Sequence, residues 1–354
     1  MTKPFRPVKG VLALICSGWL SVNLAHAKLE ALDDEALSDV TGQAFINLTT
    51  DSANGIDYTR VNFGLKVETV MNMKKLELGR YDRSGELSGT SDILIDNFAL
   101  GSVNDATGAV NPFLINNPFI ELAYSGDKVV GVRIGFGESK GTLSGDIQRL
   151  TGSVPVHIQG TADPIYDSAD VGTRILLGIA GVYRSSTMEA DAELVTGFDT
   201  ADSGNPDPVR GTYSGMRDGQ ALSCSNGCLG GLTNALLTLF KSDNCEVSGV
   251  ATCFPLTQFR SLPVGNSAIS DNAATRAIEG ASKGFFISLQ NQNLAWKDLD
   301  SGQMITALQG AFLNMSKNRD ANGNLVAPIN INFDQAFNGI PRQDTCFGTP
   351  DRGC

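Results

Sequence analysis

Six of the seven cysteines in this 354-residue chain lie beyond residue 223, and they are the strongest chemical signal in the sequence. Their spacing suggests that neighbours along the chain pair with each other, although six cysteines allow fifteen pairings. The six are Cys224, Cys228, Cys245, Cys253, Cys346 and Cys354. Because an even number of cysteines in an oxidising compartment favours disulfides, we expect three disulfides in the C-terminal part of the chain.

A zinc site is the competing interpretation of these cysteines. Structural zinc sites usually combine closely spaced C-x-x-C pairs or add histidine ligands. No C-x-x-C pair occurs, and only one histidine, His157, follows the first 27 residues. It is far from the cysteines in sequence, so disulfides are favoured over zinc.

Catalytic residues do not stand out in the sequence. A Ser-His-Asp triad would need His157, which takes an outward position in a predicted strand and is expected to be solvated. Residues 211–215 have the wrong spacing for a nucleophile elbow, and residues 280–284 only superficially resemble a phosphate-binding loop. Carboxylates are so frequent that no pair can be singled out for glycoside hydrolysis. We therefore expect no enzymatic activity.

Calcium is the one cofactor that the sequence raises as a possibility. Two oxygen-rich stretches contain Asp199, Asp202 and Asp207, and Asp320, Asn322 and Asn324. An EF-hand loop needs a glutamate at its twelfth position, and none follows Asp320 at that spacing. Asn322-Gly323 is already explained as a turn between two strands. We expect neither a metal nor another cofactor.

The first 27 residues have the three parts of an export signal. Lys3, Arg6 and Lys9 precede a largely apolar run over residues 11–24, and small residues precede a cut after Ala27. This pattern is typical of a cleavable signal peptide, and the run is shorter than the roughly 20 residues of a membrane span. Residues 1–27 are therefore interpreted as a signal peptide. The mature chain is expected in the periplasm, at the outer-membrane surface or in an extracellular filament.

Charge limits the partners of the mature chain. The whole chain carries a net charge of −11, and the signal contains three basic residues and no acidic one, so the mature chain carries −14. An acidic chain repels nucleic acid and anionic membranes. Other exported or cell-surface proteins are the expected partners. The longest later apolar run, residues 175–183, is too short for a membrane span and is interpreted as a buried strand.

Alternation of apolar and polar residues predicts a mainly β fold. Residues 28–43 form a short acidic amphipathic segment, and period-two alternation then begins. Asn54-Gly55 predicts a hairpin turn, and alternation over 61–67 and 130–136 predicts half-buried strands. The inward parity changes near Lys74-Lys75, which predicts a bulge. We expect an antiparallel sandwich, roll or barrel-like sheet.

The second half of the chain has a more mixed pattern. Residues 199–210 contain Asp, Gly, Asn and two prolines and are the best candidate for a long loop or linker. Residues 231–241 predict an amphipathic helix whose buried face would include Leu232 and Leu239. The expected organisation is a β-rich domain over 44–215 and a cysteine-containing α+β region, stapled by disulfides and with a few short helices, over 216–354.

Several stretches resemble known exported proteins. Residues 32–44, LDDEALSDVTGQA, are similar to the mature N-terminus of exported gammaproteobacterial proteins that include the pilus-assembly proteins called FilA. Residues 74–79, 92–100, 117–123 and 333–348 are similar in kind. The resemblance implies a surface filament or its assembly, with no enzymatic activity and no catalytic residues to carry over.

Three classes of function follow from these observations. A structural or surface-assembly protein fits the export signal, the β pattern and the cysteines. A periplasmic β-fold module that binds an apolar ligand is the alternative, and a cavity lined by Val, Ile and Phe would favour it. An outer-membrane barrel or a hydrolase without recognisable motifs is the third class.

Overall fold

The computed structural model describes residues 45–104, 106–198, 200–265, 278–319 and 325–345. The expected signal peptide, the acidic segment 28–43 and the cysteines at 346 and 354 lie outside these residues. All described elements belong to one compact unit, residues 44–354.

The first hairpin forms where Asn54-Gly55 predicts it. These two residues join β1 (Phe45–Ala53) to β2 (Ile56–Gly64), and the two strands pair along their whole length. Asn54 and Gly55 have φ angles of 53° and 76°. A two-residue hairpin turn needs positive φ at both positions, and Asn and Gly tolerate it best. The predicted hairpin is therefore confirmed.

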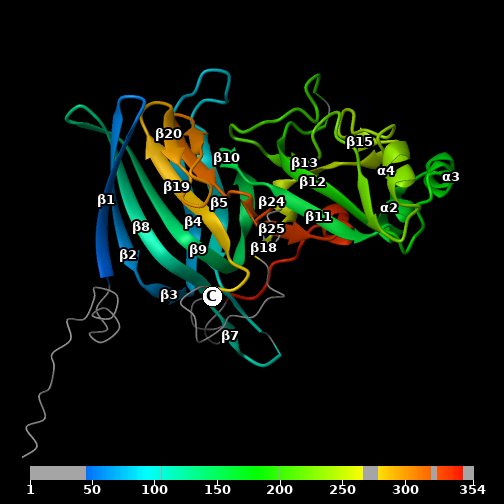
Figure 1. Cartoon of the computed structure of the whole chain (residues 1–354), viewed down its shortest axis with the longest axis horizontal. Coiled ribbons are helices and arrows are strands. Elements are labelled where there is room, and N and C mark those ends of the chain that lie inside the picture. Colours follow the sequence, from blue (N-terminus) through cyan, green and yellow to red (C-terminus); the bar gives the residue numbers. More distant parts are fainter. Residues whose placement is uncertain (1–44, 105, 199, 266–277, 320–324, 346–354) are drawn as a thin grey trace, which may run out of the picture. The chain divides into compact units, whose positions relative to one another are not determined.

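Two sheets share the 22-residue strand β9 (Lys128–Arg149) (Figure 1). The N-terminal half of β9 lies in the first sheet and its C-terminal half in the second. In spatial order the first sheet contains β1, β2, β8 (Phe113–Ser125), β9, β19 (Ser282–Gln290) and β22 (Gly310–Asn314). The second contains β4 (Met71–Arg80), β5 (Ser91–Leu100), β9, β18 (Ser261–Val264), β25 (Ile329–Ile331), β11 (Val156–Thr161) and β12 (Thr187–Val195).

Shorter strands extend these sheets or form small ladders. Those that extend the sheets are β3 (Lys66–Thr69), β10 (Gly152–Ser153), β13 (Tyr213–Gly215), β14 (Ser223–Asn226) and β17 (Cys253–Pro255). The small ladders are β6 (Ser102–Val103) with β7 (Val110–Asn111), β15 (Glu246–Val247) with β16 (Val250–Ala251), β20 (Leu294–Lys297) with β21 (Met304–Ala307), and β23 (Asn318–Arg319) with β24 (Leu325–Val326).

Helices are short and lie mostly beside the second sheet (Figure 1). They are α2 (Asp163–Ser168), α3 (Val171–Ile179), α4 (Gly231–Leu237), α5 (Phe333–Asn338) and the 3₁₀-helix η1 (Leu256–Gln258). Local sequence explains two of their starts. Asp170 caps α3 by accepting a hydrogen bond from the Thr173 N–H at 2.7 Å. Asn332 and Gln335 form a reciprocal capping box at the start of α5. Among the described residues, no helix is long and apolar enough to cross a membrane.

The fold is mainly β, as the alternation predicts, with short helices and disulfides in the C-terminal part. Most strand pairs are antiparallel, but β10 pairs with β22 and β11 pairs with β25 in parallel. A parallel pair needs a long connection between its strands, so local alternation and hairpin signals cannot predict it. Because the first and second sheets share β9, they form one large mixed sheet rather than a purely antiparallel one.

The boundary expected at residues 215/216 does not divide the described fold. Strand β19 from the C-terminal region pairs with β9 from the N-terminal region, and β22 continues the same sheet. Residues 44–354 form one compact unit. Cysteine content changes at this place in the sequence, but strand pairing crosses it.

Two apolar cores lie on different faces of the first sheet. The main core gathers buried residues from both sheets and from α2, α3, α4 and α5. The second core lies under the β20–β21 hairpin and is centred on Trp296, which is fully buried. The Trp296 ring packs edge-on against Tyr58 of β2, with ring centroids 5.5 Å apart.

The parity change in β4 has a different cause from the one expected. Met73 and Leu76 both pack against the main core, so the inward side changes between them. A bulge near residues 74–75 would place an extra residue in β4, but β4 and β5 keep one register on both sides of this place. Asn97 of β5, with a φ of 52°, lies at the same level and departs from strand geometry.

The long loop between β12 and β13 is anchored in the fold rather than acting as a linker. Arg210, near its end, has a buried side chain that pairs with the buried carboxylate of Asp92 on β5 at 3.0 Å. The Arg210 guanidinium also donates to the Thr90 hydroxyl and to the Tyr81 carbonyl. The described residues of 199–210 therefore form the expected long loop. They do not act as a linker, because Arg210 anchors them to the fold.

Candidate functional site

A row of apolar side chains crosses one face of the first sheet. Leu48 of β1 lies opposite Val61 of β2, which lies opposite Ile120 of β8. Ile120 in turn lies opposite Ile134 of β9, and Ile134 opposite Ile287 of β19. At the β19 end the row joins the main core, because Ile287 packs against it. At the β1 end the row reaches solvent, and Leu48 is 62% exposed.

We call the exposed part of this face the sheet surface, and it comprises Ile46, Leu48, Ile120, Ile134 and Leu289. Each of these side chains is at least 40% exposed. Isolated exposed apolar residues are common, but a contiguous apolar patch on a folded chain usually marks a contact with another molecule. The sheet surface is therefore the first candidate interaction site.

The outer strand of this surface is also an open edge. Strand β1 pairs only with β2 among the strands that the structure describes. Residues 45–50 carry no charge, and the one charged residue of β1, Asp51, pairs with Lys297 at 2.7 Å. An unpaired strand edge presents a row of backbone N–H and C=O groups, which can bind another strand.

The opposite face of the first sheet carries a buried charge. Arg133 of β9 is 1% exposed and pairs with Glu121 of β8. Its guanidinium lies 5.1–5.2 Å from the ring centres of Phe119, Phe286 and Trp296. Burial lowers the pKa of Arg133 from its usual value, and the Glu121 carboxylate opposes that shift. The full enclosure of Arg133 indicates a role in holding the second core together.

A polar hollow of about 280 Å³ lies beside this pair. It is lined by Thr49, Thr50, Asp51, Arg60, Glu121, Lys297, Asp298, Leu299 and Gly302. Both signs of charge line it, and several members already pair with each other. Within the described ranges, no three His, Cys, Asp or Glu side chains come together as a metal site. Of the residues considered for calcium, Asp199, Asp320, Asn322 and Asn324 lie outside the described residues.

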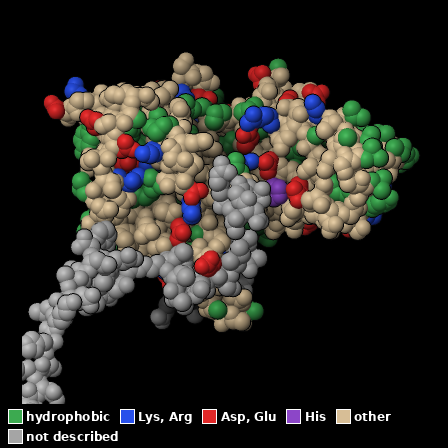
Figure 2. All heavy atoms as spheres, viewed as in Figure 1, with side chains coloured by type: hydrophobic (Ala, Val, Ile, Leu, Met, Phe, Trp, Pro, Cys, Tyr) green, Lys and Arg blue, Asp and Glu red, His purple; other side chains and the backbone are tan. Residues whose placement is uncertain are grey.

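A second apolar patch covers helices α3 and α4, where Figure 2 shows hydrophobic side chains gathered. We call it the helical surface, and it comprises Val171, Ile175, Ile179, Leu232 and Leu239, which are 59–75% exposed. Residues 171, 175 and 179 lie on one face of α3 because they are four residues apart.

Two sequence predictions are wrong at the helical surface. Residues 175–183 are not a buried strand, since α3 spans most of them and its outer face is exposed. Residues 231–241 do include a helix, but Leu232 and Leu239 point to solvent, whereas Thr233 and Leu237 are buried. Both predictions assumed that the most apolar face of an element is buried. A surface that violates this assumption is a second candidate interaction site.

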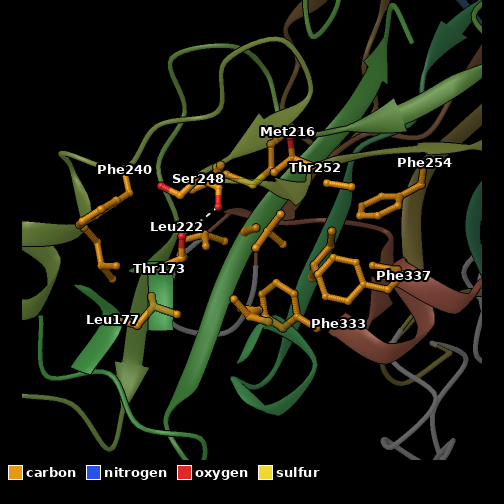
Figure 3. Close-up of a pocket in the computed structure, with 18 of the residues that line it drawn as sticks. Thr173, Leu177, Met216, Leu222, Phe240, Ser248, Thr252, Phe254, Phe333 and Phe337 are labelled. Carbon is orange, nitrogen blue, oxygen red and sulfur yellow. Dashed lines mark hydrogen bonds between the residues drawn. The ribbon is translucent and has the colours of Figure 1, made fainter. Parts of the chain in front are cut away.

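An apolar cavity of about 40 Å³ lies beneath these helices (Figure 3). Leu177 from α3 and Phe333 and Phe337 from α5 point into it, with Met216, which follows β13, and Phe254 of β17. At its rim, the Thr173 hydroxyl donates to the Ser248 carbonyl at 3.0 Å and ties α3 to the β15–β16 turn.

The cavity is too small for a ligand in this structure. A water molecule occupies about 30 Å³ of liquid, and sites for drug-sized ligands usually measure about 300–1,000 Å³. A neighbouring apolar cavity of about 30 Å³ shares Ile158 and Phe254 with the first.

His157 is half-buried rather than fully solvated. Its Nδ1 lies 3.0 Å from the Asp191 carboxylate on β12. The hydrogen bond from His157, with Lys317 at 2.8 Å, lowers the pKa of Asp191 to about 2. In the described part of the chain, no hydroxyl group hydrogen-bonds to His157. In the described residues, the His157–Asp191 pair therefore has a carboxylate that orients the imidazole but no hydroxyl nucleophile hydrogen-bonded to it.

Four of the six C-terminal cysteines form two disulfides, and each joins cysteines that are neighbours in the sequence. Cys224 pairs with Cys228, and Cys245 pairs with Cys253. The second disulfide is buried against Val195, the last residue of β12. Both disulfides lie in the irregular region that carries α4 and the β15–β16 hairpin. The expected pairing of the cysteines at 346 and 354 lies outside the described residues.

Sequence patterns did not reveal either apolar surface. Alternation correctly predicts which residues share a face of a strand, but not whether another element covers that face. For Ile120 and Ile134, both neighbouring strands within the sheet are present, and none of the described elements covers their side chains.

Comparison with known proteins supplies no function. Residues 8–107 match a model described as a family of unknown function (DUF6160), which covers less than half of the chain. The match includes the acidic segment 28–43 and strands β1 to β5. No curated protein and no solved structure matches the chain.

Proposed function

We propose that this chain is an exported structural protein that takes part in a surface or filament assembly, without catalytic activity. Its partners are other exported or cell-surface proteins, including copies of itself. The observation that carries the proposal is the sheet surface, an apolar face that leaves the main core and continues, uncovered by the described residues, to the open edge of β1.

The energetics of this surface favour association. Burying one Leu or Ile side chain contributes about 1.5–3 kcal/mol. Covering five side chains that are about half exposed would therefore contribute on the order of 4–7 kcal/mol, before the cost of association. The helical surface offers a second, separate contact. A subunit with two contact surfaces can join two neighbours, which an extended assembly requires.

Other features support the same proposal. Disulfides and the apparent signal peptide are consistent with export. The resemblance of residues 32–44 to pilus-assembly proteins also favours a surface role. Among the described residues, no hydroxyl group hydrogen-bonds to His157, and Arg133 is fully enclosed in the second core.

Electron microscopy of cell surfaces tests the proposal. Cells that lack the gene should lose a surface filament or layer, and the wild-type gene should restore it. Ile134→Asp places a charge in the centre of the sheet surface and should fail to restore it. Leu87→Asp is the matched control, since Leu87 is 78% exposed but lies in the β4–β5 loop.

The proposal predicts that the Leu87→Asp gene restores the surface filament or layer as the wild-type gene does. Both variants must be exported in equal amount for the comparison to hold. Unchanged cell surfaces after deletion of the gene would contradict the proposal, as would full restoration by Ile134→Asp.

Binding of an apolar ligand is the second candidate function. The apolar cavity beneath α3 favours it, together with the neighbouring cavity that shares Ile158 and Phe254 and with the exposed apolar outer face of α3. In this function α3 and α4 would act as a movable cover, and a ligand with an alkyl chain would enter the second-sheet core.

Binding of a fluorescent fatty acid tests this candidate. Ala251→Phe would fill the first cavity, which Ala251 lines, and should abolish saturable binding. Ala235→Phe is the control, because Ala235 is exposed on α4 and does not line the cavity. The candidate fails if the wild type shows no saturable binding, or if both variants bind equally well.

A further inference from the structure

From the open edge of β1 we infer that two copies of this chain pair antiparallel along β1, with Asn47 of one copy opposite Asn47 of the other. The inference rests on the proposed assembly function and names its partner as a second copy. The pairing uses the backbone edge of β1 as well as the apolar side chains. It therefore requires a free strand edge and one specific register, which a general apolar contact does not.

Strand β1 lacks the features that usually protect an edge. Folded proteins block exposed edges with proline, with lysine, with bulges or with a covering element. The nine residues of β1 include no proline and no lysine, and their pairing with β2 is regular. Within the part of the chain that the structure describes, a long and regular edge without these protections is therefore available for another strand.

Charge also permits a second copy at this edge. Two acidic chains repel each other over their whole surfaces, so contact requires a region with little charge. Residues 45–50 are uncharged, and Asp51 is paired with Lys297 of its own chain. Two copies can approach along this segment without bringing unpaired like charges together.

The alternation in β1 selects the register. Residues directly opposite each other in an antiparallel pair lie on the same face, so two identical strands pair around a single residue. With Asn47 at the centre, Ile46 faces Leu48 of the second copy, and Leu48 faces its Ile46. With Thr49 at the centre, Leu48 would face Thr50 and Ile46 would face Ser52. With Leu48 at the centre, Leu48 would face Leu48, but Ile46 would face Thr50. Of these three registers, only the first matches apolar with apolar side chains on both sides of the centre.

This register extends the apolar row across two molecules. Ile134, Ile120, Val61 and Leu48 form a continuous row within one copy. In the pair, Leu48 lies opposite Ile46 of the second copy, and the row continues over the first sheet of that copy. The two sheet surfaces thus become one face, twice as wide, for further assembly.

Disulfide trapping tests the inference. In the expected register the two Asn47 Cα atoms lie about 4.5–5.5 Å apart, within the range that a disulfide spans. The chain with Asn47→Cys, purified from the exported fraction, should form a covalent dimer under mild oxidation. Thr306→Cys is the control, because Thr306 is exposed on β21, which like β1 pairs with a single described strand. It should form no covalent dimer.

A second pair of variants separates the edge from the rest of the sheet surface. Leu48→Asp should raise the dissociation constant of the dimer at least about tenfold. Leu289→Asp, on the same face but four strands away, should leave the dimer intact. If Asn47→Cys gives no dimer while Ile134→Asp still abolishes surface assembly, the inference is wrong and the proposed function stands. A dimer that forms equally with Thr306→Cys, or one insensitive to Leu48→Asp, also overturns the inference.

Discussion

The substitution Asp92→Asn gives a direct test of how the long loop before β13 is held. The Asp92 side chain is fully buried, and its two oxygens have different partners. One accepts from Arg210 at 3.0 Å, and the other accepts from the Ala311 N–H at 2.9 Å. Gly79 and Gly310 lie so close that any side chain at either position would collide with the carboxylate.

Asparagine has the same shape but only one acceptor oxygen and no charge. It would leave the buried Arg210 guanidinium without its counter-charge, or the Ala311 N–H without its acceptor. Removing one partner of a buried ion pair typically costs about 3–5 kcal/mol. With an m-value of about 3 kcal/mol per molar in urea, the unfolding midpoint should fall by about 1–1.7 M.

Urea unfolding of the two proteins, followed by circular dichroism, measures this effect. Asp167→Asn is the matched control, since Asp167 forms an ion pair with Arg184 at 2.9 Å in which both side chains are at least half exposed. Exposed pairs contribute about 0–1 kcal/mol, so its midpoint should move by less than about 0.3 M. Equal shifts for the two variants would refute the reasoning that the loop is anchored by this pair.

Three further predictions follow from the disulfides, from Asp191 and from the helical surface. Reductant should increase hydrogen exchange over residues 213–255 while β19 and β22 stay protected, because these two strands belong to the first sheet; uniform loss of protection would contradict this. The pKa of Asp191 is lowered to about 2, so its contribution to stability is present above about pH 4 and is lost as the pH falls towards 2. Titration followed by NMR should find that pKa, and a value near 4 would refute the interaction with His157. Ile175→Asp on the outer face of α3 should leave the unfolding midpoint nearly unchanged, since Ile175 is 59% exposed; a fall as large as that of Asp92→Asn would show that the helical surface is covered.

Local patterns in the sequence predict the parts of this fold that depend on local chemistry. Asn54-Gly55 sets the turn between β1 and β2 because few other residues accept its φ angles. Cysteine spacing correctly suggests neighbouring partners for Cys224 and Cys245. In each case the interacting residues are fewer than ten positions apart.

Features that depend on distant segments could not be predicted. The parallel pairing of β11 with β25 joins residues more than 170 positions apart. The exposure of α3 and of the sheet surface depends on which elements fail to cover them. Hydrophobic pattern marks a face as apolar, but the remainder of the chain decides whether that face is buried or left for a partner.

Sedimentation velocity of the purified exported chain tests the central claim of assembly through the sheet surface most directly. Wild type should show a sedimentation coefficient that rises between about 1 μM and about 100 μM protein, a range that corresponds to association free energies of roughly −8 to −5.5 kcal/mol. Ile134→Asp, with an unchanged circular dichroism spectrum, should associate no further than the dimer paired along β1. A wild-type chain that is monomeric at every concentration, or an Ile134→Asp chain that associates equally, would contradict the claim.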